Sequence, residues 1–83
     1  MMTLAYLDSF SGLVPVRVVA VGDWSDPQSE ARIQFTATRG PWKRGEFETF
    51  PLRRVVPRSA IRRRKYSTRI ASYSWADIRK GRH

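Results

Sequence analysis

Residues 31–38 read ARIQFTAT, and this strict alternation of apolar and polar side chains decides the fold class. Ile33 and Phe35 fall on one side of an extended chain, whereas Arg32 and Gln34 fall on the other. A period of two residues is typical of an antiparallel strand with one face in a core and the other in water. The stretch therefore predicts a β-strand and an all-β fold.

The preceding apolar stretch, residues 13–21 (LVPVRVVAV), predicts a second strand. It is dominated by β-branched valine, which suits a pleated, half-buried surface. Val14, Val16, Val18 and Ala20 are expected on one face. Because Pro15 has no N–H to donate, we expect this end of the strand to lie at a sheet edge or at a bulge.

Shorter strands are expected over residues 3–7, 46–50 and 53–56, with turn residues between them. Short strands at regular spacing indicate a small five-stranded antiparallel barrel or sandwich. The residues that strand position and type assign to its core are Leu4, Tyr6, Val14, Val16, Val18, Ile33, Phe35, Phe47, Val55 and Ile61.

The order of elements late in the chain resembles a known architecture. Val55 and Val56 end a strand, residues 57–60 read as one helical turn that begins with proline, and extended chain resumes at Ile61. This order resembles the SH3-like small barrels, in which one helical turn precedes the last strand. The resemblance covers residues 4–64. It implies an all-β barrel but no single function, since such barrels bind peptides, RNA, DNA and modified histone tails.

The length of the chain, 83 residues, fits one domain. We divide it into an SH3-like β-barrel at residues 1–65 and a basic C-terminal tail at residues 66–83. A short helix is predicted over residues 74–80, where Ser74 can cap the first turn and an acidic residue follows three positions later. So short a helix depends on docking against the barrel.

Charge is distributed unevenly along the chain. Residues 39–83 hold fourteen of the sixteen Lys and Arg residues and carry a net charge of +11, whereas residues 1–38 carry −2. Residues 53–69 alone hold eight cations and no acidic residue. Concentrated like charge costs stability through self-repulsion, so it indicates an anionic partner. The alternative is a solvated surface whose arginines reflect the base composition of the genome.

Within that run, residues 61–65 have no apolar face. In an extended chain, Arg62 and Arg64 point one way while Arg63 and Lys65 point the other. Both faces would then be charged, and the segment could lie along a phosphate backbone as an extended arm, releasing condensed counterions as it binds.

The loop at residues 39–45 (RGPWKRG) places Trp42 among Arg39, Lys43 and Arg44. An indole beside cations can stack a base while the cations hold its phosphate. The alternative is that Trp42 folds back onto the barrel. Trp24 lies in an acidic loop that would repel phosphate, so we interpret it as a lid on the core or a contact for a protein.

Catalytic and metal-binding motifs are missing from the sequence. The one histidine is His83, there is no cysteine, and no Gly-rich phosphate loop occurs. The acidic residues of the first half are spread over separate turns without the spacing of an acid/base pair. We therefore expect neither an enzyme nor a metal or cofactor site.

These observations lead to the hypothesis of a nucleic-acid-binding protein that contacts phosphates and has weak sequence specificity. Both DNA and RNA, single- or double-stranded, fit the residue types, and the oligomeric state stays open. The expected binding residues are Arg39, Trp42, Lys43, Arg44, Arg53, Arg54, Arg58, Arg62, Arg63, Arg64, Lys65, Tyr66 and Arg69.

Two other classes of function fit the same composition. One is a protein-interaction module, an inhibitor or assembly factor that docks on an acidic partner protein. The other is a structural subunit of a ribonucleoprotein or virion. The small size and arginine-rich end also resemble the accessory proteins of bacteriophages.

The composition also bears on where the protein acts. Apolar runs fall far short of the roughly 20 residues that span a bilayer, and residues 1–10 lack the features of a secretion signal. With no cysteine for disulfides, we expect a cytoplasmic protein that does not enter membranes.

Overall fold

The computed structural model describes residues 3–10, 12–65 and 67–79. It contains a five-stranded antiparallel sheet, a separate two-stranded sheet, two 3-10 turns and one short helix. The elements in chain order are β1 (Thr3–Ser9), β2 (Gly12–Val21), β3 (Glu30–Phe35), β4 (Phe47–Pro51), η1 (Leu52–Arg54), β5 (Val55–Pro57), η2 (Arg58–Ala60), β6 (Ile61–Arg64), β7 (Ser67–Ile70) and α1 (Trp75–Arg79). The prediction of a small all-β protein is confirmed.

The large sheet has the strand order β4-β3-β2-β1-β5. Strands β1 to β4 form a meander, and β5 returns to pair with β1, with Tyr6 opposite Val56. In the part of the chain that the structure describes, the two outer strands β4 and β5 do not pair with each other. The sheet is thus open in its hydrogen bonding, and the expected closure into a barrel is not observed.

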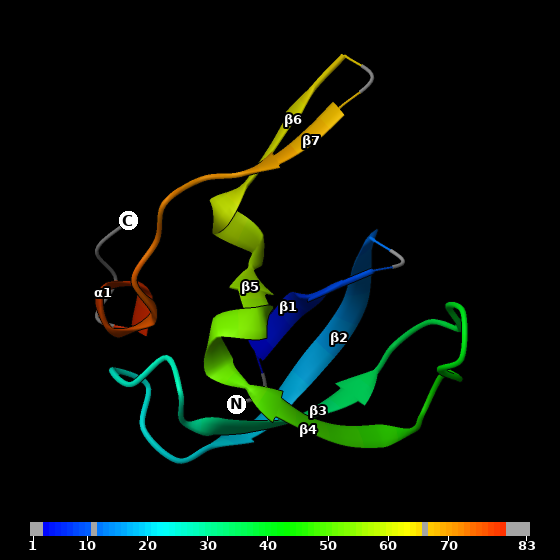
Figure 1. Cartoon of the computed structure of the whole chain (residues 1–83), viewed down its shortest axis with the longest axis horizontal. Coiled ribbons are helices and arrows are strands. Elements are labelled where there is room, and N and C mark those ends of the chain that lie inside the picture. The colour runs from blue at the N-terminus through cyan, green and yellow to red at the C-terminus, as the bar shows by residue number, and fades with distance from the viewer. Residues whose placement is uncertain (1–2, 11, 66, 80–83) are drawn as a thin grey trace.

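The core lies on one face of this sheet, and β2 and β3 supply most of it. Val14, Val16 and Val18 are buried as predicted, and so are Ile33 and Phe35. Their β-branched and aromatic side chains alternate with outward polar residues, which is why the sequence identified them. Figure 1 shows how the meander of β1 to β4 lies beside β5.

The predicted phase of β1 is wrong. Ala5 and Leu7 face the core, so Leu4 is 47% exposed and Tyr6 is only half-buried on the outer face. The strand carries apolar residues in both phases, and register with β2 decides between them, because a one-residue slip turns every side chain over.

Two other expected core residues also lie at the surface. Phe47 pairs with Gln34 on the outer face and is 47% exposed, while Ile61 begins β6 outside the large sheet and is half-buried. Their place is filled by Leu52 of η1 and by Trp75 of α1, both buried. These two residues complete the core from beyond the strands.

Strand β2 departs from its predicted geometry at two points. A bulge between Val18 and Ala20 shifts its register against β3, so Ala20 turns outward and is exposed. Pro15 lies in a strand flanked by β1 and β3 and not at an edge. Its ring nitrogen faces the end of β3, where the Pro15 carbonyl accepts a hydrogen bond from Thr36.

The helical turn predicted at residues 57–60 is present as η2, with Pro57 at its start. A second turn, η1, was not predicted, and it directly precedes the strand that joins β1. The extended chain after Ile61 does not join the large sheet. It forms the hairpin β6–β7, which projects away from the rest of the molecule (Figure 1).

The predicted C-terminal helix is confirmed over Trp75–Arg79, and Ser74 caps it by accepting a hydrogen bond from the Asp77 backbone N–H. Its docking is also as expected, since the Trp75 side chain is buried among the core residues. Residues 67–79 therefore contribute a strand and a core anchor, and the expected boundary at residue 65 falls within a hairpin.

Candidate nucleic-acid interface

The hairpin β6–β7, which we call the ribbon (residues 61–70), carries the centre of the basic run. Ile61 pairs with Ile70, and Arg62 pairs with Arg69 directly opposite. Residues opposite each other in an antiparallel pair share a face. Arg62 and Arg69 therefore lie side by side on one face of the ribbon, and both are exposed.

The opposite face of the ribbon is also cationic. Arg63 pairs with Thr68, one residue along from the Arg62–Arg69 pair, so it points to the other side. Arg63 and Thr68 are exposed. The expectation that this segment is charged on both faces agrees with this register.

A groove of about 390 Å³ lies where the ribbon meets the large sheet. Arg39 and Arg63 line it together with Tyr6, Pro15 and Thr68, and Leu13 completes its wall. Arg39 follows β3 and Arg63 belongs to β6, so the fold brings two expected binding residues together from distant parts of the chain.

A second groove, of about 320 Å³, adjoins the first because it shares Tyr6 and Arg63 with it. Arg58 of η2 and Ile61 line its far side. We call the two grooves together the Tyr6 groove. Its lining contains three arginines and no carboxylate, and forked guanidinium groups around one groove are suited to holding phosphate oxygens.

The outward position of Tyr6 follows from the strand pairing. Tyr6 lies between Pro15 on β2 and Val56 on β5, and Val56 is buried beneath the outer surface. The half-buried Tyr6 side chain lines both grooves, as Arg63 does. The sequence placed Tyr6 in the core, so this member of the site was missed.

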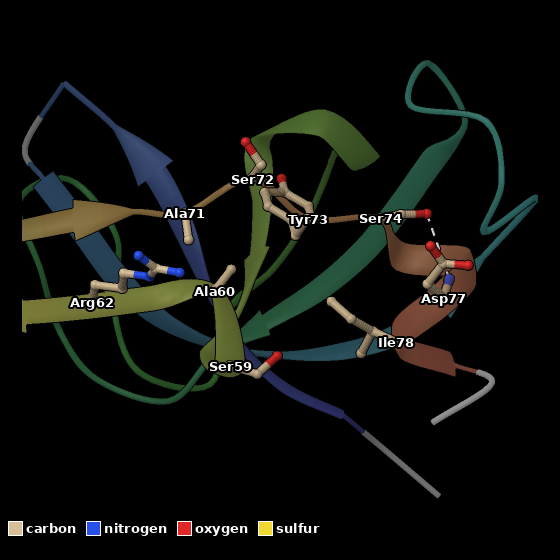
Figure 2. Close-up of a pocket in the computed structure, with 9 residues that line it drawn as sticks. All are labelled: Ser59, Ala60, Arg62, Ala71, Ser72, Tyr73, Ser74, Asp77 and Ile78. Atoms are coloured by element: carbon tan, nitrogen blue, oxygen red, sulfur yellow. Dashed lines mark hydrogen bonds between the residues drawn. The ribbon is translucent and has the colours of Figure 1, made fainter. Parts of the chain in front are cut away.

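Among the described residues, none of Arg58, Arg62, Arg63 and Arg69 forms an ion pair with a carboxylate. Asp77 lines the same groove as Arg62, a hollow of about 460 Å³, but Figure 2 shows the two side chains on opposite sides of it. The cations of the ribbon root are therefore available to an external anion.

Two of the arginines predicted to bind nucleic acid, Arg53 and Arg54, do not line the Tyr6 groove. The Arg54 guanidinium donates hydrogen bonds to the Asp8 carbonyl oxygen at 3.2 and 3.4 Å and lies 4.9 Å from the centre of the Phe50 ring. It ties η1 to the end of β1. Arg53 lines a different pocket, beside Trp24 and Trp75, which shares no residue with the Tyr6 groove.

The loop between β3 and β4 is held by its own backbone. Arg39 and Trp42 exchange backbone hydrogen bonds of 2.9 and 3.0 Å, and the Lys43 N–H donates to the Glu46 carboxylate. The Lys43 and Arg44 side chains are exposed, and Arg44 lines a separate groove with Arg17. Of the three cations expected around Trp42, Arg39 alone lines the Tyr6 groove.

Trp42 packs against the core. Its ring stacks on Phe35, with centroids 5.2 Å apart and planes 15° from parallel, and Phe50 meets it edge-on at 6.4 Å. Phe10, 87% exposed at the β1–β2 turn, lies 6.2 Å away on a tilted plane. This geometry agrees with the alternative in which Trp42 folds back, and the structure places it against the core.

Two predicted site residues are described less fully. Tyr66 lies outside the described residues. The backbone of Arg64 pairs with Ser67 at the end of the ribbon. Lys65 follows at the turn and is exposed.

Two of the four acidic residues in residues 1–38, Asp23 and Asp26, lie in the loop between β2 and β3. The Asp23 carboxylate accepts hydrogen bonds from the Ser25 N–H and hydroxyl at 2.9 and 2.7 Å, and these bonds lower the pKa of Asp23. Trp24 in this loop packs on Trp75, with ring centres 5.0 Å apart, and the Arg79 guanidinium lies over the Trp24 ring, 4.7 Å from its centre. The interpretation of Trp24 as a lid on the core fits these contacts.

A pocket of about 260 Å³ lies beside that lid, lined by Trp24, Tyr73 and Trp75 with Arg53 at its border. Burial raises the pKa of Tyr73, and the negative charge of Asp8 raises it further. The Tyr73 hydroxyl donates to the Val55 carbonyl at 3.3 Å. This aromatic pocket is chemically unlike the arginine-lined Tyr6 groove.

The acidic side chains are too dispersed to form a metal centre. No group of three or more His, Asp or Glu side chains is placed to hold a metal ion in residues 3–10, 12–65 and 67–79. Across the same residues, no helix is long and apolar enough to cross a membrane.

No family model matches the chain, and neither a curated protein nor a solved structure is significantly similar to it. The function is therefore argued from the geometry and charge of the grooves themselves.

Proposed function

We propose that this protein binds nucleic acid, chiefly through phosphate contacts and with weak sequence preference, using the Tyr6 groove and the ribbon. The observation that carries the proposal is the convergence of Arg39, Arg58 and Arg63 on one groove without a carboxylate in its lining. These residues come from a loop, a 3-10 turn and a strand, so their meeting is a product of the fold.

The architecture supports the same proposal. We propose that the large sheet is a variant of the SH3-like barrels, on the basis of its strand order β4-β3-β2-β1-β5 and the 3-10 turn before β5. The sequence assigned the helical turn before the last strand of the barrel to residues 57–60, which form η2. In the proposed arrangement, η1 is the turn before that last strand. The ribbon is then an addition after the last strand of the sheet, and it supplies the basic surface.

Electrostatics give the proposal a measurable consequence. Each phosphate that a cation neutralises releases condensed counterions, so the logarithm of the binding constant falls with the logarithm of salt concentration by roughly 0.9 per contact. Loss of the three groove arginines should therefore reduce the slope by about 3. Loss of three remote arginines should reduce it much less.

The test compares two triple variants of equal net charge. One is Arg39→Gln, Arg58→Gln and Arg63→Gln. The control is Arg17→Gln, Arg32→Gln and Arg79→Gln, whose exposed side chains do not line the Tyr6 groove. Fluorescence anisotropy of a labelled oligonucleotide, measured over a series of salt concentrations, gives each slope. Equal slopes for the two variants would remove the Tyr6 groove from the interface.

A second candidate function is a protein-interaction module, favoured by the aromatic pocket at Trp24, Tyr73 and Trp75. Aromatic side chains are enriched in the centres of protein interfaces. An NMR titration separates the two candidates. An oligonucleotide should shift the resonances of Tyr6 and Arg63, whereas a partner protein that docks on the aromatic pocket should shift those of Trp24 and Trp75.

A further inference from the structure

Tyr6 differs from the other aromatic residues that the structure describes. Each of the others lies beside a second aromatic ring or a guanidinium, as Trp42 does on Phe35 and Phe47 does under Arg32. Tyr6 has no such neighbour among the described residues, and its hydroxyl forms no hydrogen bond with them. The Tyr6 side chain is therefore free to meet a ring that comes from outside the protein.

The side chains beside Tyr6 form an apolar strip on the outer face of the large sheet. Tyr6 lies opposite Pro15 of β2 and Val56 of β5, and residues opposite each other share a face. Tyr6 and Pro15 are half-buried. Val56 is buried, although it does not belong to the core cluster on the other face. The strip therefore offers apolar surface to a flat ring that approaches from solvent.

Cations lie on two sides of this strip. Strand β1, which carries Tyr6, runs between β2 and β5 (Figure 1). The groove that contains Pro15 of β2 also contains Arg39, whereas the groove that adjoins the end of β5 contains Arg58. Arg63 lines both grooves. The aromatic side chain thus lies where two arginine-lined grooves meet.

We propose that Tyr6 stacks on an unpaired base, so that the nucleic acid held in the Tyr6 groove is single-stranded. This inference rests on the proposed nucleic-acid binding and names its substrate class. An internal nucleotide of a strand has a phosphate on each side. With its base on Tyr6, one phosphate lies toward Arg39 and the other toward Arg58, and Arg63 lies within the lining of both grooves.

Stacking on Tyr6 requires a base whose face is open. In a duplex, the bases present only their edges to a protein, through the grooves, and a base must leave the stack before a side chain can cover its face. An unpaired base has an open face, and every base can stack on an aromatic ring. Stacking therefore agrees with the weak sequence preference proposed above. Single-stranded DNA and RNA share this chemistry, and the test distinguishes them.

The other aromatic residues are less suited to this role. Trp42 is stacked on Phe35, and Trp24 packs on Trp75 with a guanidinium over its ring. Phe10 is 87% exposed, but it lines neither groove and lies beside Trp42. Among the described residues, Tyr6 alone combines a ring without an aromatic or cationic partner with arginines in the same groove.

The first experiment varies the ligand and keeps the wild-type chain. The probes are an oligothymidylate, an oligouridylate of the same length, an abasic DNA oligomer with as many phosphates, and a DNA duplex with as many phosphates. The abasic oligomer measures phosphate binding without bases. We expect one or both base-bearing single strands to bind about tenfold more tightly than the abasic oligomer, which is the effect of one stacked base. The duplex should bind more weakly than the preferred single strand.

The second experiment varies the protein. Tyr6→Leu removes the ring and keeps an apolar side chain beside Val56, whereas Tyr6→Phe keeps the ring and removes the hydroxyl. Phe47→Leu is the matched control, because Phe47 is 47% exposed on the outer face and lines neither groove. We expect Tyr6→Leu to lose the tenfold preference for the base-bearing strand, and Tyr6→Phe and Phe47→Leu to retain it. Amide NMR spectra verify that the large sheet is intact.

The salt dependence separates stacking from phosphate contacts. Tyr6→Leu removes no cation, so it should weaken binding of the single strand by the same factor at every salt concentration and leave the slope unchanged. The triple variant of Arg39, Arg58 and Arg63 should reduce the slope instead. Binding of the abasic oligomer and of the duplex should be the same in Tyr6→Leu and in wild type.

The outcomes distinguish this inference from the proposed function. Equal binding of abasic and base-bearing strands by wild type, tighter binding of the duplex, or an equal loss in Tyr6→Phe and Tyr6→Leu would overturn base stacking on Tyr6, while salt-dependent binding would still support phosphate contacts. If Tyr6→Leu disturbs the sheet, the wild-type comparison of abasic and base-bearing strands still decides. An absence of salt-dependent binding to every probe would overturn both proposals.

Discussion

The indole nitrogen of Trp75 donates a 2.8 Å hydrogen bond to the carbonyl oxygen of Val55. Val55 begins β5, which precedes the ribbon in the chain, and Trp75 begins α1, which follows the ribbon. The hydrogen bond therefore joins the two ends of the segment that contains the ribbon. Both residues are buried in the core. The chain that forms the ribbon is therefore closed at its base by a contact between distant parts of the sequence.

Removal of that hydrogen bond should destabilise the whole fold. We expect Trp75→Phe to lower the free energy of unfolding by about 2 kcal/mol, from the lost hydrogen bond and the smaller buried ring. The matched control is Trp24→Phe, because the Trp24 indole nitrogen donates no hydrogen bond within the described residues. Urea denaturation measures the free energy of unfolding of both variants. Equal losses of stability would contradict the importance of the hydrogen bond to Val55.

Ionisation of Tyr73 should destabilise the protein at alkaline pH. Burial raises the pKa of Tyr73 above its usual value, so folding favours the neutral phenol. This contribution is fully present below the unfolded pKa of about 10 and is lost as pH rises through the higher folded pKa. Stability measured against pH should fall less steeply there in Tyr73→Phe, and phenolate absorbance follows the ionisation directly.

The packing of Trp42 predicts an effect on stability and not on binding. We expect Trp42→Ala to cost about 2 kcal/mol, because a half-buried ring loses its contacts with Phe35 and Phe50. Phe10→Ala should change stability by less than about 0.5 kcal/mol, because Phe10 is largely exposed. The salt dependence of oligonucleotide binding should match wild type in both variants. A weaker binding constant with unchanged stability in Trp42→Ala would show instead that the indole stacks on bases.

The turn before β4 requires glycine at one position. Gly45 has φ +93°, its N–H donates to the Phe35 carbonyl at 2.8 Å, and nothing lies within 4 Å of the position that a Cβ would take. Gly45→Ala should therefore cost about 1 kcal/mol through backbone strain alone. Gly45→Asn should cost less, because Asn tolerates positive φ. Thermal denaturation compares the two, and an unchanged melting temperature in Gly45→Ala would contradict the strain.

The central strands could be predicted because local pattern and tertiary structure agree there. In residues 31–35 and at Val14, Val16 and Val18 of β2, alternation alone separates buried from exposed positions. In β1 the pattern is ambiguous, since Leu4 and Leu7 lie in opposite phases and small Ala5 occupies a core position. Pairing with β2 and β5 resolves it, and a sequence pattern does not contain that pairing.

The candidate site also has one part that could be predicted from the sequence and another part that could not. The charge of residues 53–69 is visible in the sequence, and so is the alternation of Arg62 and Arg63 between two faces. The groove at Tyr6 is not visible, because it forms only when a loop, a 3-10 turn and the ribbon meet on the outer face of the sheet. The pairing of Ile61 with Ile70 was also missed, although two isoleucines flanking a basic stretch could have indicated a hairpin.

The closed base of the ribbon has a consequence for how freely the sequence of the projecting strands can vary. Substitutions along the projecting strands leave the folding free energy of the sheet nearly untouched, since the core ends at Ala60 and resumes at Trp75. The exposed arginines of this segment can therefore vary in number and spacing without removing contacts from the core.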